Sequence, residues 1–509
     1  MTVHIGRPLG FEDVVAVARR REEVAVLPDV EDVMAPARAV VDQAVASGET
    51  VYGISTGIGD LANVRIDTGL ARELQRDIVR SHATAVGPPL PSEVVRAMLL
   101  LRARTFAFGV SGVRFEIVER LVAMLNAGVH PVVPAQGSLG ASGDLAPLAH
   151  LALPLIGEGR AELDGSVLPG AEALRKAGIE PLQLSYKEGL ALVNGTELML
   201  ALGILVYERA RALARVADVT GAMTIEACLG TDAAFHEELI ALRKHPGAQV
   251  SARNLRRLLD ASEIVASHKE SDHLVQDAYS LRCMPQVHGA YRDALRYVGA
   301  TLEAELGSAI DNPTVMTGEG RLLSGGNFHG EALGLALDHL CLLLTGFATI
   351  AERRVARLVD PVLSNGLPAF LTSEPGRRSG FMIVQYTAAS LVSENRSLCW
   401  PTSADSIPSS AGQEDHVSMG ATSARKASAI LANTEHVLAI EALAAAQGLD
   451  LRAPLSPASG TAAARAAVRE VSPFLEDDRP LSDDIGGVRH LIAEGELLGA
   501  PEKEIGALE

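Results

Sequence analysis

The segment 137–150 contains residue types whose spacing allows the chain to build a reactive group from itself. Its centre reads Ala141-Ser142-Gly143 and is followed by Asp144 and an apolar, helix-like run. The nitrogen of Gly143 is unhindered and can approach the carbonyl carbon of Ala141, and loss of water from the ring and from Ser142 would leave a conjugated methylidene. That product is an electrophile. The alternative is a glycine-rich turn in which Ser142 or Asp144 caps the next helix.

Other segments carry polar or aromatic side chains that suit a site. Tyr52 follows a short extended run and enters a glycine-rich loop, and His82 ends a predicted helix, where the helix dipole alone would favour it. Gln276, Tyr279 and Arg282 are spaced three apart, which places them on one face if the segment is helical. The remaining candidates lie in or beside glycine-containing segments: Asn194, Asn312, Asn327, Phe328 and Glu414. Each of these residues, considered alone, could equally have a structural role, in a tight turn, on a solvent-exposed helix face or at the start of a helix.

One segment matches a sequence motif of a different class of enzyme. Gly53-Ile54-Ser55-Thr56-Gly57 matches G-x-S-x-G, the nucleophile elbow of α/β-hydrolases. More glycine follows where a long helix is expected, and the chain lacks alternating strands and helices, so a serine hydrolase is a remote alternative. His236-Glu237-Glu238 lacks the second histidine of a zinc motif, and no phosphate-binding G-x-x-x-x-G-K-[ST] sequence occurs. We therefore expect no metal and no nucleotide.

Composition favours a large helical enzyme that acts on a small molecule. Hydrophobic residues make up 48% of the chain and aromatic residues only 4%, and Ala, Leu and Val recur at helical spacing. A net charge of −18 argues against nucleic acid. Four cysteines without close pairs predict reduced thiols, and the N-terminus lacks a signal pattern, so a cytoplasmic location is expected. Asp338 and His339 inside the apolar segment 332–350 predict a buried helix rather than a membrane span.

Local patterns also predict individual elements. Helical spacing is found over 11–23, 30–47 and 70–108, the last interrupted near Gly87-Pro88-Pro89. Asp164-Gly165 predicts a hairpin turn. The chain is expected to become helical at Tyr186 and to continue through 187–197 into an apolar helix that reaches about Val216.

In order and approximate separation, the candidate segments closely resemble the aromatic amino acid ammonia-lyase and aminomutase family, over almost the whole chain from Tyr52 to Met419. The resemblance implies a mainly α fold with a long central helix bundle, divided into an N-terminal region, 1–190, that carries the reactive segment and a helical-bundle region, 191–509, as one cooperative unit. It implies a homotetramer with each site built from several chains. It also implies that Ala141-Ser142-Gly143 become the cofactor 4-methylidene-imidazol-5-one (MIO), with Asp144 assisting ring formation.

The same resemblance implies a role for each remaining candidate. Tyr52 is similar to the loop tyrosine placed against the substrate β-carbon, as a base. Arg282 is similar to the arginine that pairs with the substrate carboxylate, which its planar guanidinium suits. His82 and Glu414 match the two positions linked to the substrate ring. Four further residues match family members' residues that line the pocket or form hydrogen bonds with MIO and with the substrate carboxylate: Asn194, Gln276, Tyr279 and Phe328.

The residues at the ring end of the pocket favour an imidazole substrate. An imidazole needs polar partners, which His82 and Glu414 supply, and Ala83 matches the histidine-specific members of the family. The expected reaction is elimination of ammonia from L-histidine to give trans-urocanate. Ile58, Thr84, Met284 and His288 are among the departures from the commonest forms, so a tyrosine or phenylalanine ammonia-lyase, or an aminomutase that gives a β-amino acid, stays open. Trp400, the only tryptophan, has no predicted role.

Overall fold

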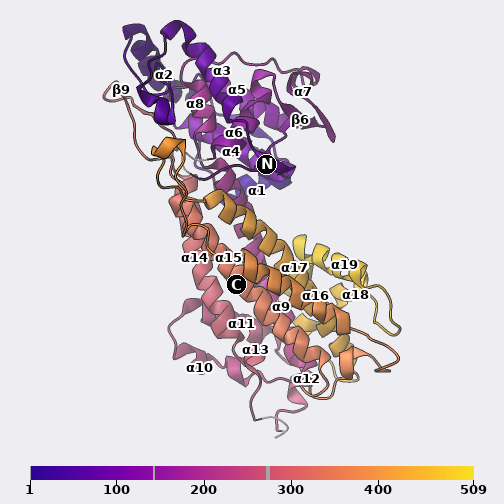
Figure 1. Cartoon of the computed structure of the whole chain (residues 1–509). Coiled ribbons are helices and arrows are strands. Elements are labelled where there is room, and N and C mark those ends of the chain that lie inside the picture. The colour runs from indigo at the N-terminus through magenta and orange to yellow at the C-terminus, as the bar shows by residue number, and fades with distance from the viewer. Residues whose placement is uncertain (1, 141–143, 271–274) are drawn as a thin grey trace. The chain divides into compact units, whose positions relative to one another are not determined.

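The computed structural model of the protein describes residues 2–140, 144–270 and 275–509. The chain forms two compact units, each assembled from three segments. The first unit contains Met1–Leu205, Gly299–Asp338 and Pro401–Arg425, and the second contains Val206–Val298, His339–Trp400 and Lys426–Glu509. The described part of the chain is mainly helical, with only short strands, as the composition predicts (Figure 1). The division predicted at residue 190, and the single cooperative unit, stay predictions.

The first unit is built around one helix that is covered on all sides. Helix α4 (Ser92–Ala107) is buried at every position from Val94 to Phe106, and it packs against α1 (Phe11–Arg19) and α5 (Phe115–Asn126). A helix covered all round loses the one-sided apolar stripe of a surface helix. The other α-helices that lie wholly in the described part of this unit are α2 (Asp29–Ser47), α3 (Ala71–His82), α6 (Leu145–Ala152), α7 (Gly170–Lys176) and α8 (Glu188–Val193).

Short sheets and single 3-10 turns complete the first unit. Strands β1 (Val3–Ile5) and β2 (Val24–Val26) form a parallel pair. The helix predicted over 11–23 therefore ends at Arg19, because the chain must leave the helix before it pairs as β2. The antiparallel sheet has the order β4-β6-β7 (His130–Pro131, Arg160–Leu163, Ser166–Pro169), and the hairpin predicted at Asp164-Gly165 is confirmed. Two further pairs join β3 (Val86–Pro89) to β5 (Pro134–Gln136) and β8 (Thr314–Met316) to β9 (Arg321–Leu323).

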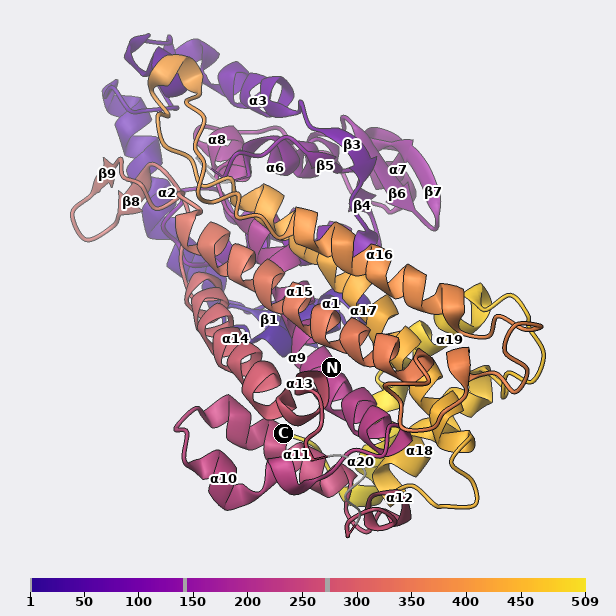
Figure 2. The ribbon, with the colours of Figure 1, turned by 60° about the horizontal axis from the view of Figure 1, so that its bottom comes forward.

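The second unit contains most of the residues of the long helices, although several of these helices begin or end in the first unit. Figure 2 shows α14 (Met284–Leu306), α15 (Glu331–Val359), α16 (Met382–Leu398) and α17 (Gly420–Asp450) running alongside one another. Its other helices are α10 (Glu237–Ala241), α11 (Pro246–Leu258), α12 (Glu263–Ala266), α13 (Tyr279–Arg282), α18 (Ser459–Val471), α19 (Ser482–Ala493) and α20 (Glu496–Ile505), together with the later part of α9 (Glu197–Ala227).

Buried polar side chains connect three of these long helices. The guanidinium of Arg354 in α15 forms an ion pair with Glu441 in α17, and neither side chain is exposed. Glu441 also accepts a hydrogen bond from Thr220 of α9 at 2.7 Å. Each charge therefore has partners inside an otherwise aliphatic core, as buried charges require.

Helices α15 and α17 are long and apolar enough to cross a membrane by length and composition alone. Their most apolar windows are 61% and 78% buried within the protein. The helix expected over 332–350 lies within α15, and Asp338 is buried there at 3% exposure.

Candidate active site

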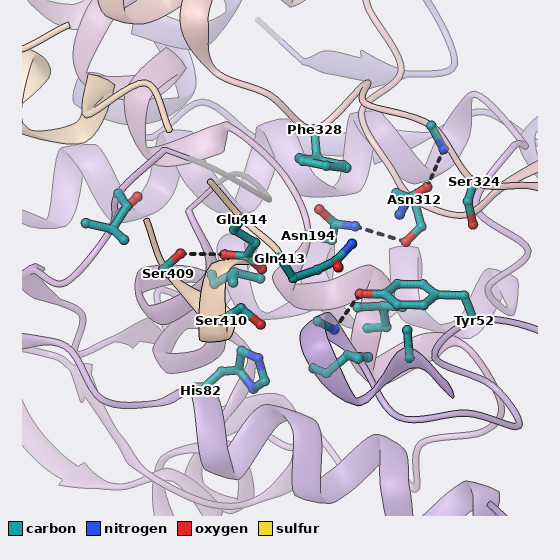
Figure 3. A pocket seen from close by; sticks show the side chains of 18 of the residues that line it. Tyr52, His82, Asn194, Asn312, Ser324, Phe328, Ser409, Ser410, Gln413 and Glu414 are labelled. Atoms are coloured by element: carbon teal, nitrogen blue, oxygen red, sulfur yellow. Dashed lines mark hydrogen bonds between the residues drawn. The ribbon is translucent and has the colours of Figure 1, made fainter. Parts of the chain in front are cut away.

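Six of the candidate residues line one cavity of about 620 Å³ in the first unit. They are Tyr52, His82, Asn194, Asn312, Phe328 and Glu414. They come from segments far apart in the sequence, and Figure 3 shows their side chains directed toward a common space. The fold therefore brings together residues that the sequence only placed in order along the chain.

Asn194 reaches the cavity because the chain is not helical there. The helix expected from Tyr186 through 187–197 is interrupted: α8 ends at Val193, Asn194 has an extended backbone, and α9 begins at Glu197. Helix α9 ends at Ala227, beyond the end predicted near Val216. The Nδ2 group of Asn194 donates to the Asn312 carbonyl at 2.9 Å. Its Oδ1 is buried and has no hydrogen-bond partner among the described residues. The side chain is thus held on one side and left with an open acceptor on the other.

A buried charge network supports Asn194 from behind. Arg102 of α4 donates to the Asn194 carbonyl at 3.1 Å and forms a 3.0 Å ion pair with Glu197. Next to it, the buried ammonium of Lys187 lies 2.8 Å from Asp311. These fully desolvated pairs are costly to break, so they fix the backbone on both sides of the cavity.

The predicted cofactor residues Ala141, Ser142 and Gly143 lie outside the described residues, but both flanks are held tightly. The carbonyl of Gly140 accepts from the Gly330 nitrogen at 3.1 Å and from the Ser418 hydroxyl at 3.2 Å. Gly140 has φ +75°, and a Cβ at this position would collide with the Ser418 hydroxyl. Only glycine fits such a close approach in the left-handed region.

Asp144, on the other flank, is fully buried and accepts two hydrogen bonds. Its carboxylate accepts from the Ser138 hydroxyl at 2.8 Å and from the Met199 nitrogen at 3.0 Å. Burial raises the pKa of Asp144 to about 7, against the opposing effect of these two hydrogen bonds. A carboxyl group with such a pKa can both accept and release a proton near neutral pH.

Four helices begin beside this segment. Helix α6 starts at Leu145, α9 at Glu197, α15 at Glu331 and α17 at Gly420. The hydrogen bonds from Met199 to Asp144 and from Gly330 to Gly140 connect two of these starts to the flanks. Helix N-termini carry partial positive charge, so a negative charge that develops here is stabilised.

Tyr52 lies half-buried at the side of the cavity, and its hydroxyl accepts a hydrogen bond from the Gly59 nitrogen at 2.9 Å. Burial raises the pKa of Tyr52, the Gly59 hydrogen bond lowers it, and the charge of Glu414 raises it further. The Gly59 N–H group therefore favours the phenolate, which is the form that can accept a proton.

His82 and Glu414 present hydrogen-bond acceptors to the same cavity. The Nδ1 atom of His82 lies 2.8 Å from the Ile78 carbonyl one turn earlier in α3. Since a carbonyl only accepts, Nδ1 carries the proton and Nε2 is left as the acceptor in the neutral ring. Burial lowers the pKa of His82, against the Ile78 hydrogen bond and the Glu414 charge. Glu414 accepts from the Ser409 hydroxyl at 2.9 Å through Oε2.

Gln276, Tyr279 and Arg282 do not line this cavity and belong to the second unit. Tyr279 and Arg282 lie in the four-residue helix α13, which Gln276 precedes, so a helical face holds two of the three residues. The Arg282 guanidinium lies 4.7 Å from the centre of the Tyr279 ring, and its Nε donates to the Asp277 carbonyl at 2.9 Å. Arg282 lines a different cavity, of about 380 Å³.

The serine of the G-x-S-x-G segment is a turn residue. The hydroxyl of Ser55 donates to the Glu49 carbonyl at 2.8 Å and accepts from the Val51 nitrogen at 2.9 Å. Ser55 does not line the cavity, and both of these partners of its hydroxyl are backbone groups rather than a histidine. Among the described residues there is also no group of three His, Cys, Asp or Glu side chains that could hold a metal ion.

Sequence reasoning missed several supporting residues. Ser138 and Ser418 hold the flanks of the reactive segment, and Ser410 contacts the loop that carries Tyr52. Ser138 lies in the segment 137–150, and Ser410 and Ser418 each lie four residues from Glu414, but a serine beside glycines carries no signal of its partner. Asn312 is a supporting residue that the sequence did indicate: it is one of the candidates, and its carbonyl fixes the Asn194 side chain.

Comparisons with known proteins identify the family of the chain. A profile of the aromatic amino acid lyase family matches residues 9–470. The chain is 52% identical to a histidine ammonia-lyase of Sorangium cellulosum, covering 99% of both chains, and 52% identical to one of Gloeobacter violaceus, covering 99% of this chain and 98% of the relative.

Solved structures of the same kind superpose on the chain. The histidine ammonia-lyase of Trypanosoma cruzi has a TM-score of 0.91 at 42% identity, covering 99% of this chain and 95% of that one. A tyrosine aminomutase of Streptomyces globisporus has a TM-score of 0.93 at 39% identity, covering 99% of both. The mainly α fold is thus that of the aromatic lyases and aminomutases. The chain belongs to the aromatic amino acid lyase family.

Proposed function

We propose that this protein is a histidine ammonia-lyase, which eliminates ammonia from L-histidine to give trans-urocanate. The observation that carries the proposal is the pairing of His82 and Glu414 in the cavity that also holds Tyr52. An imidazole ring has a nitrogen on each side and, when protonated, an N–H group on both. A phenol offers one donor and a phenyl ring none, so two acceptors favour histidine. Full-length relatives at about half identity support the same choice.

We infer that Ala141, Ser142 and Gly143 form MIO. The fixed flanks, the buried Asp144 and the helix N-termini suit the closure of a small ring that gains negative charge. When formed, MIO supplies an electrophilic carbon for an electron-rich group of the substrate. The open acceptor of Asn194 and the ring of Phe328 would line the space beside it.

The remaining chemistry falls to side chains of this chain. Tyr52 accepts the β-proton, and Gly59 stabilises the phenolate that does so. His82 and Glu414 hold the imidazole so that the substrate β-carbon lies against Tyr52. The β-proton is thus oriented toward the base before it is transferred. The elimination needs both an electrophile and an oriented base, because ammonia is a poor leaving group and the β-proton of an amino acid is only weakly acidic.

An ultraviolet assay with product identification tests the proposal. L-histidine, L-tyrosine and L-phenylalanine are supplied separately to the purified protein. We expect urocanate and ammonia from histidine, with no β-histidine. Turnover of tyrosine or phenylalanine with histidine untouched would overturn the substrate, and a β-amino acid as the main product would indicate an aminomutase, the activity of one structural relative.

Replacing His82 with leucine should raise KM for L-histidine by about 10- to 100-fold, because one ring nitrogen then faces an apolar wall. His82→Gln keeps a side-chain acceptor and should lose less. Steady-state kinetics on the wild type and both variants measure the effect. Equal KM values for wild type and His82→Leu would show that His82 does not bind the ring.

We further propose that Gln276, Tyr279 and Arg282 complete the cavity of another copy of the chain, in a cytoplasmic homotetramer. The support is that they lie outside the cavity formed by the first unit, while the exposed Tyr279, at 73%, and Arg282 form a preorganised pair. A carboxylate would suit the guanidinium of Arg282.

Complementation between two impaired variants tests this arrangement. Arg282→Met should raise KM by at least about 30-fold, since the substrate carboxylate loses its partner. When Tyr52→Phe and Arg282→Met chains are coexpressed, mixed assemblies should contain some cavities with both native residues and regain activity. Failure to regain activity in mixed assemblies verified by mass spectrometry would place both residues in a cavity of one chain.

A further inference from the structure

Two loops meet above the cavity at Gly59 and Ser410. Gly59–Asn63 forms the short turn η1 after Tyr52, and Ser410–Gly412 forms the turn η6 before Glu414. The Ser410 hydroxyl accepts a hydrogen bond from the Asp60 nitrogen at 3.0 Å. Figure 3 shows Ser410 between His82 and Glu414, and both Gly59 and Ser410 line the cavity.

The fit between the two turns is tight. Gly59 has φ +58°, and a Cβ on it would collide with the Ser410 hydroxyl. Gly59 also provides the N–H group that bonds the Tyr52 hydroxyl at 2.9 Å. The Ile58–Gly59 peptide is therefore held by Tyr52 and the following Gly59–Asp60 peptide by Ser410, so the two hydrogen bonds fix the backbone on both sides of the Gly59 Cα.

The Ser410 turn is itself fixed on a rigid base. Ser410 and Ala411 both have positive φ, of 50° and 53°. The backbone of the preceding Ser409 is bonded to that of Glu414 in both directions, at 2.9 and 3.2 Å, and the Ser409 hydroxyl holds the Glu414 carboxylate. Non-glycine residues keep such backbone angles only when their surroundings impose them.

We propose that Ser410 is a positioning residue for Tyr52: its hydroxyl fixes the Gly59–Asp60 peptide and with it the conformation of Gly59, whose N–H group, in the preceding peptide, then points at the Tyr52 hydroxyl. The assignment rests on the proposed function, in which Tyr52 is the base. It also connects the two ends of the substrate, because the turn that holds the ring partner Glu414 also holds the base loop.

Loss of the Ser410 hydroxyl should change both the rate and its pH dependence. Ser410→Ala and Ser410→Gly are each expected to lower kcat for L-histidine by about 3- to 10-fold, the effect of one hydrogen bond, with KM little changed. The Gly59 bond lowers the pKa of Tyr52, so its weakening should move the rising limb of kcat to higher pH. The other titratable side chains that line the cavity, His82 and Glu414, are unaltered.

Ala411→Gly is the matched control. It lies next to Ser410, shares the positive φ and does not line the cavity, so activity and pH profile should match the wild type. If Ala411→Gly gives the same shift as Ser410→Ala, the backbone of the turn and not the hydroxyl is responsible, and the proposal is overturned. An unshifted pH profile in Ser410→Ala overturns it as well.

A spectroscopic titration separates this proposal from the proposed function. The chain has seven tyrosines, and the difference between wild type and Tyr52→Phe isolates the phenolate absorbance of Tyr52. Ser410→Ala should titrate Tyr52 at higher pH than the wild type does, whether or not histidine is turned over. An unchanged Tyr52 titration rejects the positioning role, whereas a shifted titration without lyase activity rejects only the proposed function.

Discussion

Replacing Ser142 with alanine is expected to abolish ammonia release from L-histidine, by more than about 10³-fold, given the rate accelerations that enzymes commonly reach. Alanine lacks the hydroxyl that must leave when the methylidene forms, so no electrophile is produced. Two measurements check this: the ultraviolet assay, and intact-mass spectrometry of the purified chain. The mass of the wild type should be lower than that calculated from its sequence by two water molecules, one lost on ring closure and one lost from Ser142. The variant has no hydroxyl at residue 142, so its mass should be lower by one water molecule at most.

The serine hydrolase alternative makes the opposite prediction. If Ser55 were a nucleophile, Ser55→Ala would lose the activity and Ser142→Ala would keep it. In the structure Ser55 instead bonds two backbone groups of its own turn. A wild-type chain whose mass matches the full sequence would contradict MIO formation, and would favour a protein that only binds its ligand.

Replacing Tyr52 with phenylalanine is expected to lower kcat by about 10²- to 10⁴-fold, the range for loss of a general base. The ring keeps its place, while the oxygen that meets the Gly59 N–H group is removed. KM for L-histidine should change little, because His82 and Glu414 are untouched, and the two-water mass deficit should remain. The retained mass deficit is the control that separates a failed base from a failed cofactor.

The pH profile gives the sign of the Tyr52 effect. Burial raises the pKa of Tyr52, so the protonated form dominates at neutral pH and the phenolate fraction grows as the pH increases. The wild-type rate should therefore rise with pH until Tyr52 is ionised, and the Tyr52→Phe rate should lack that rise. A variant that keeps both the wild-type kcat and the rise would assign the base to another group, with Glu414 the first candidate in the cavity.

Local sequence patterns predicted the elements that local forces determine. The hairpin at Asp164-Gly165, the end of α2 at Gly48 and the separation of α3 from α4 near Gly87 all follow from backbone preferences of a few residues. The length of α1 was wrong, because β2 pairs with the N-terminal strand and so ends the helix early. That pairing depends on residues about twenty positions away, which no short window contains.

The sequence by itself determined which chemical groups are available. Ala141-Ser142-Gly143 can close a ring because of their own small side chains, and the order of Tyr52, His82, Asn194, Arg282, Phe328 and Glu414 along the chain was sufficient to indicate the family. These properties are carried by residue type and spacing, and they do not depend on the conformation of the chain.

Only the tertiary structure decided how these groups are tuned and held. Burial gives Asp144 a pKa near neutrality, the break before α9 turns Asn194 into the cavity, and Ser410 meets the loop of Tyr52 across 350 positions of sequence. It also left Arg282 out of the cavity that the first unit forms. Desolvation and hydrogen-bond geometry arise from packing between distant segments, so they cannot be read from neighbours in the chain.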